Sequence, residues 1–113
     1  MADPLSTNPE LYRVVFENRR VRVLEYLDQP GDRTSPHSHP DSVMVTLGAF
    51  RRRLNAAGQD VEVDLPAFQA RWLDAQEHSG INSGDTATHT MFIELKELPP
   101  EPGEAGRLGP SIS

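Results

Sequence analysis

Short runs of alternating apolar and polar residues, separated by turn-forming residues, fill the middle of this 113-residue chain. The segments 21–27 and 61–65 both alternate in this way, and a period of two is typical of a β-strand with one buried face. The segments 55–58 and 82–85 are rich in Asn, Gly and Asp, which favour turns. No amphipathic helix of useful length is found. The pattern therefore predicts an all-β sandwich or barrel.

Seven segments have the length and composition of strands. They are residues 11–17, 20–28, 42–50, 51–55, 61–65, 70–73 and 86–95. Trp72 and its β-prone neighbours favour a strand over a helix at 70–73. We expect Trp72 and Phe92 to belong to the core, and the alternative is that either forms part of a cavity wall. Successive strands joined by short turns predict an antiparallel meander.

The composition limits the chain to one core. Hydrophobic residues make up 36% of the chain and charged residues 25%, and a chain of this length buries only about two-thirds of its unfolded surface. Residues 1–10 carry two prolines among mixed polar residues, and residues 97–113 are rich in Pro and Gly, which predicts flexible ends. The folded domain is therefore expected at residues 11–96.

The charge and the absence of cysteine limit the kinds of partner. With 17 acidic and 11 basic residues the net charge is −6, so binding to nucleic acid or to an anionic membrane is not expected. A small-molecule ligand or substrate is expected instead. Without cysteine, any metal site must use N and O ligands. The chain shows neither a membrane-spanning run nor the apolar segment of a signal peptide, so we expect a cytoplasmic protein.

Histidines are the best candidates for metal ligands. His37 and His39 are two residues apart, so on an extended chain they point to the same face, about 7 Å apart. His78, which follows a predicted strand, is the best third donor. Three neutral imidazoles suit one divalent Fe, Zn, Ni, Cu or Mn ion. The alternative is that His37 and His39 are solvated loop residues between two prolines.

The surrounding residues resemble the two motifs of the cupins, a family of small metal-binding β-barrels. Gly31, a five-residue gap and His37-Ser-His39 resemble the start of the first motif, and His78 followed four positions later by Asn82 resembles the end of the second. The resemblance covers about residues 11–96. It implies an antiparallel, jelly-roll-like cupin barrel with the metal inside one end.

The sequence departs from the cupin pattern where a glutamate ligand is usual. Val43 and Met44 stand at those places, and Val43 is in phase with the first two histidines if the strand is continuous, so an apolar group is expected there. A three-histidine site is similar in its ligands to those of thiol and diketone-cleaving dioxygenases. The resemblance implies a dioxygenase-like enzyme acting on a small oxygen-bearing compound. The alternatives are a non-redox isomerase, lyase or hydrolase, and a non-catalytic ligand-binding or sensor module.

Other polar residues are candidates for supporting roles. Gln76 could be a weak fourth ligand, a donor to substrate or water, or a surface residue, and His89 could shuttle protons if its strand face looks inward or could simply pack. Asp41 could orient an imidazole or belong to a turn. Residues 51–53 are all arginine, and alternation along a strand places Arg52 on the face opposite to that of its two neighbours. One cation of this run should therefore point inward.

The resemblance also implies a homodimer, because cupins often pair. The apolar residues Leu11, Val14, Val15 and Phe16 could form the interface.

Overall fold

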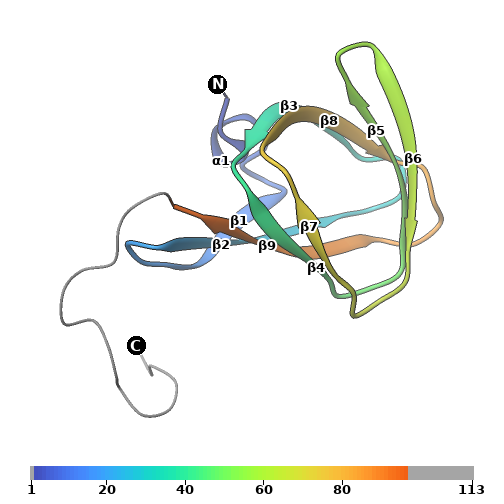
Figure 1. The fold of residues 1–113 in the computed structure, drawn as a ribbon. Coiled ribbons are helices and arrows are strands. Elements are labelled where there is room, and N and C mark those ends of the chain that lie inside the picture. Colours follow the sequence, from blue (N-terminus) through green and yellow to red (C-terminus); the bar gives the residue numbers. More distant parts are fainter. Residues whose placement is uncertain (1, 97–113) are drawn as a thin grey trace.

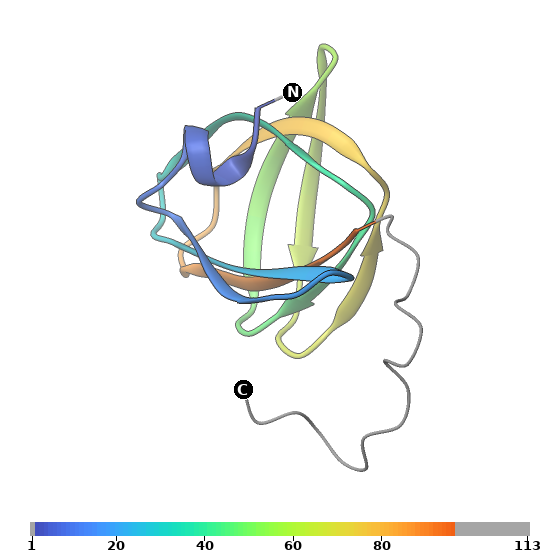
Figure 2. The same ribbon diagram turned by 90° about the vertical axis from the view of Figure 1, so that its left-hand side faces the viewer.

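The computed structural model describes residues 2–96, which form two antiparallel sheets facing each other (Figure 1). The five-stranded sheet has the order β1 (Tyr12–Glu17), β2 (Val21–Asp28), β9 (Thr88–Leu95), β4 (Ser42–Thr46), β7 (Ala70–Leu73). The four-stranded sheet has the order β3 (Arg33–His39), β8 (Gln76–Asn82), β5 (Phe50–Ala56), β6 (Gln59–Leu65). The expectation of an all-β antiparallel barrel is thus confirmed. Figure 2 shows the strands arranged around a common interior.

Alternation decides which side chains enter this interior. Along β9 the residues Thr88, Thr90, Phe92 and Glu94 are buried, while those between them are more exposed. The apolar core is small, and Phe92 packs there with two tyrosines and a leucine of β1 and β2. Much of the interior is therefore polar, which leaves room for a functional site.

Two strands were not predicted, and both carry the histidines. β3 and β8 contain few apolar residues, so they lack the alternation that marks the other strands. The predicted strand 42–50 is also divided, because β4 ends at Thr46 and β5 begins at Phe50. The bend between them carries the chain from one sheet to the other.

A short helix precedes the barrel. α1 (Pro4–Thr7) begins after Asp3, whose carboxylate accepts a hydrogen bond from the backbone N–H of Leu5 at 3.0 Å. Asp3 also pairs with Arg22 at 2.7 Å, and Asn8 is 3% exposed. This part of the segment expected to be flexible therefore packs against the barrel. The predicted tail 97–113 lies outside the described residues.

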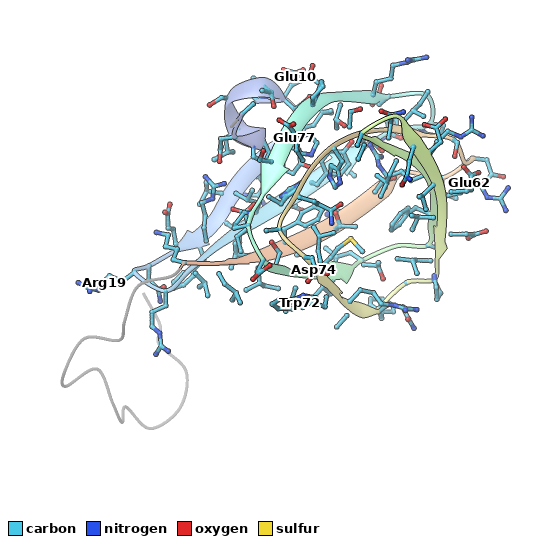
Figure 3. All side chains as sticks on the ribbon, turned by 45° about the horizontal axis from the view of Figure 1, so that its top comes forward. Glu10, Arg19, Glu62, Trp72, Asp74 and Glu77 are labelled. Atoms are coloured by element: carbon cyan, nitrogen blue, oxygen red, sulfur yellow. The ribbon has the colours of Figure 1, made fainter. Side chains whose placement is uncertain are left out.

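Several side-chain placements differ from the sequence expectations. Trp72 is 55% exposed and donates from Nε1 to Asp74 on the outer surface, so its expected place in the core is wrong (Figure 3). The face of β9 that carries His89 looks outward, because Thr90 and Phe92 occupy the inner face. Arg52 points inward and is 7% exposed, as alternation predicts.

Within residues 2–96, no helix has the length and apolar character needed to span a membrane.

Candidate metal centre

The fold brings His37, His39 and His78 together inside the barrel. His37 pairs directly with His78 across the β3–β8 ladder, and His39 follows on the same face of β3. One ring nitrogen from each histidine lies within 4.8 Å of the other two. The residues are 1%, 1% and 9% exposed, so the solvated-loop alternative is wrong.

Each histidine Nδ1 faces a hydrogen-bond acceptor. His37 Nδ1 lies 2.7 Å from the carbonyl oxygen of Ser35, and His39 Nδ1 lies 3.0 Å from Glu94 Oε2. His78 Nδ1 lies 2.8 Å from the side-chain oxygen of Gln76. A proton on each Nδ1 satisfies these three acceptors and leaves each Nε2 with a free lone pair. That is the tautomer required of imidazoles that bind a metal through Nε2.

Burial favours the neutral form of His37 and His78. Desolvation lowers the pKa of His37, although the Ser35 carbonyl opposes the shift. Burial and the two neighbouring histidines lower the pKa of His78 to about 3. Neutral nitrogen donors fit a divalent transition metal of the Fe, Zn, Ni, Cu or Mn class. The donor set therefore could hold such an ion.

The acceptors are themselves held in place. Glu94 is 2% exposed, and its Oε1 accepts a hydrogen bond from Arg22 Nε at 2.9 Å and forms an ion pair with Arg22 Nη2 at 2.7 Å. Asn8 accepts from the Ser35 N–H at 2.8 Å and donates to the Ser35 carbonyl at 3.3 Å. These contacts restrict the carboxylate and carbonyl that orient His39 and His37, so the histidines are preorganised.

Tyr12 is a further member of the site that the sequence did not indicate. Its hydroxyl lies 3.3 Å from His37 Nε2 and 3.5 Å from His39 Nε2. Burial raises the pKa of Tyr12, so the phenol is neutral. A single tyrosine in a predicted strand gives no motif, and only the sheet order places it opposite the histidines.

A cavity of about 160 Å³ adjoins His37 and His78. Its walls are largely apolar and include Met44, Leu54 and Phe92. The ring of Phe92 also stacks on His39, with 4.8 Å between the ring centroids. The histidines thus border a space that could take a small molecule.

An apolar residue stands where a glutamate ligand is usual in cupins, as expected. That residue is Met44 and not Val43. Val43 faces the outer side of the five-stranded sheet, paired with Trp72 and Ile93. Met44 lines the cavity instead. The phase assumed from the histidines is wrong because β3 ends at His39 and the chain bends before β4 begins.

Two of the remaining candidates lie away from the free histidine nitrogens. Asp41 accepts from the backbone N–H of Ala75 at 2.9 Å, which is the turn role. His89 lies on the outer sheet face, with its Nε2 2.6 Å from Glu25, and is absent from the cavity lining. Gln76 contacts His78, but on its Nδ1 side. Its position fits an orienting residue.

The fold and the site together define a small antiparallel β-barrel with a candidate mononuclear metal centre. No family model matches the sequence, and no curated protein matches it. A cupin domain from Bordetella pertussis Tohama I is 30% identical, with a TM-score of 0.71 over 76% of this chain and 92% of that one. The chain therefore belongs to the cupin family, as the two histidine motifs predict.

More distant structures share the fold. A double-stranded β-helix protein from Klebsiella pneumoniae is 20% identical, with a TM-score of 0.61 over 85% of this chain and 79% of that one. A polyketide cyclase from Streptomyces resistomycificus is 18% identical, with a TM-score of 0.56 over 79% of this chain and 66% of that one. These likenesses support the barrel alone.

Proposed function

We propose that this cupin is a metal-dependent enzyme of the dioxygenase type that acts on a small oxygen-bearing compound. The observation that carries the proposal is that three buried imidazoles bring one ring nitrogen each within 4.8 Å of the other two, beside a cavity. A bound divalent ion would supply a Lewis acid and a template for substrate and oxygen.

The chain's own residues account for binding and orientation. His37, His39 and His78 would hold the ion, and Gln76 and Glu94 fix two of the rings. None of the three ligands is charged, so an anionic or enolisable substrate would balance the positive charge of the ion. The largely apolar lining beside the histidines would limit the access of water to a substrate.

Metal analysis is the first test of this proposal. Protein purified without an affinity tag should contain about one equivalent of a transition metal, or bind it on reconstitution, and a variant with His37, His39 and His78 all changed to alanine should not. His89→Ala is the matched control, because this histidine lies on the outer surface. Equal metal content in all three proteins would contradict the site.

The reaction class is tested separately. The Fe(II)-loaded protein should consume oxygen with at least one member of a panel of diketones and thiols, and His37→Ala should abolish the uptake. If no compound stimulates oxygen uptake while the metal is fully bound, the dioxygenase proposal fails and the metal site stands.

One observation favours an oxygen-independent alternative. The neutral Tyr12 hydroxyl faces two of the histidines at 3.3 and 3.5 Å, where it could donate a proton to a metal-bound substrate. An isomerase or lyase would need such a donor and no oxygen. Turnover under nitrogen with Zn, Mn or Ni, lost in Tyr12→Phe, would support this alternative, and unchanged turnover in that variant would contradict the role of Tyr12.

A further inference from the structure

Thr90 carries a buried hydroxyl that has no hydrogen-bond partner within residues 2–96. The residue is 1% exposed and lines the cavity, and no atom among residues 2–96 forms a hydrogen bond with its Oγ1. Its neighbours differ: Thr46 Oγ1 donates to the Pro66 carbonyl at 2.7 Å, and Thr88 Oγ1 accepts from Arg52 at 3.2 Å. A buried hydroxyl is costly to leave unpaired. The partner of Thr90 must therefore come from whatever fills the cavity.

Arg52 and Tyr26 border the same cavity as Thr90. Tyr26 pairs with Thr90 across the β2–β9 ladder, and its hydroxyl accepts from Arg52 Nη2 at 3.1 Å. A Cβ on Gly80 would lie 3.2 Å from Arg52 Nε, so glycine gives the guanidinium its space. Arg52 belongs to β5 of the four-stranded sheet, and its guanidinium reaches across to Tyr26, the neighbour of Thr90. This wall of the cavity therefore combines a buried cation with a hydroxyl that is unpaired within residues 2–96.

The charge of that cation is already balanced. Arg52 Nη1 donates to Asp28 at 2.7 Å, and the Asp28 side chain is fully buried. Asn82 also donates to Asp28, at 3.0 Å. Because the pair is neutral overall, this wall offers polar contacts without a net charge. It suits an uncharged oxygen, such as a hydroxyl or carbonyl, better than a second carboxylate.

The cavity lies between Thr90 and the histidines, which come from opposite sheets. His37 and His78 belong to the four-stranded sheet and Thr90 to the five-stranded sheet, and packed sheets lie roughly 10 Å apart. The cavity volume is about 160 Å³, close to the roughly 150 Å³ of an apolar cavity known to hold benzene. A ligand of about one ring would reach both walls.

We propose that Thr90 is a specificity-determining residue, which binds an uncharged oxygen at the end of the ligand opposite the metal-binding group. This inference rests on the proposed metal centre and narrows its ligand to a one-ring-sized compound with oxygen at both ends. Benzoate and 4-hydroxybenzoate are suitable probes, because they differ only in the second oxygen.

The test uses the full chain loaded with Co(II), whose visible spectrum reports coordination of the carboxylate, and calorimetry for the dissociation constants. The wild-type protein should bind 4-hydroxybenzoate about three- to tenfold more tightly than benzoate, the worth of one neutral hydrogen bond. Thr90→Val should abolish this preference and leave benzoate binding unchanged. The variant loses no hydrogen bond within residues 2–96, so it should fold.

Thr46→Val is the matched control, because Thr46 of β4 is the cross-strand neighbour of Thr90 but does not line the cavity. It should keep the preference even if it melts at a lower temperature. Equal binding of both compounds by the wild type, binding of neither, or a preference that survives Thr90→Val would each overturn the inference. Failure of the metal centre is seen separately, as no Co(II) uptake by the wild type or equal uptake by His37→Ala.

Discussion

Replacing Glu94 with glutamine should weaken metal binding without removing a ligand. On Oε1, Glu94 accepts a hydrogen bond from Arg22 Nε and forms an ion pair with Arg22 Nη2, and on Oε2 it accepts from His39 Nδ1. Glutamine has one acceptor oxygen and one NH₂ group, so it cannot accept from both partners. If the NH₂ faces His39, the ring must change tautomer and turn an N–H toward the metal position. If the oxygen faces His39, the NH₂ opposes Arg22.

Either arrangement disturbs the preorganised imidazole. Loss of an orienting partner of a ligating histidine typically lowers metal affinity about 10- to 100-fold, or roughly 1.4–2.7 kcal/mol. Competition with a colorimetric Zn(II) chelator at fixed pH measures the change. Glu25→Gln is the matched control, because Glu25 holds His89 at 2.6 Å in a similar pair on the outer surface. A Zn(II) affinity for Glu94→Gln within threefold of the wild type would refute the reasoning.

Three further predictions concern stability and assembly. Burial lowers the pKa of His78 from 6.5 to about 3, so as the pH falls the unfolded state binds a proton before the folded state does. The metal-free protein should therefore lose up to about 1.4 kcal/mol of unfolding free energy per pH unit between pH 6.5 and about pH 3. His78→Gln should flatten that slope in urea titrations, and an unchanged slope would contradict it. Asp28→Ala should cost about 3–5 kcal/mol in the same titrations, because Arg52 then lacks its buried counter-ion; a loss below about 1 kcal/mol would contradict a dry ion pair. The apolar residues 14–16 are 40–44% exposed, so light scattering should find a dimer that Val15→Glu dissociates, and a wild-type monomer at high concentration would exclude it.

The sequence predicts strands well where one face is apolar. Segments 20–28 and 61–65 are close to the observed β2 and β6. It fails at β3 and β8, because there the inward positions carry histidines in place of core residues. The signal of alternating hydrophobicity is lost at the candidate site itself.

The sequence also cannot decide which face of β9 is inside. His89, Met91, Ile93 and Leu95 form the more apolar-looking set, yet the opposite set is buried. The reason is that Glu94 finds partners in Arg22 and His39, which come from strands far away in the chain. Such pairing depends on the order of strands in the sheets, and no local pattern records it.

The histidine motif, in contrast, could be recognised from spacing and family resemblance. The spacing could not predict which side chains surround the three histidines. Tyr12 reaches the histidines only because β1 lies beside β2 at the edge of the five-stranded sheet. Thr90 is a candidate only because its hydroxyl lacks a hydrogen-bond partner in the part of the chain that the structure describes.

The residues of the site lie far apart in the sequence, and this affects whether metal binding can precede folding of the barrel. The three histidines precede Glu94 in the sequence, and β9 must insert between β2 and β4 to bring Glu94 to His39. A nascent chain that has not yet added β9 therefore has all its ligands but lacks the group that orients one of them. We expect tight metal capture to follow closure of the barrel, so that metal loading is a late step in biosynthesis.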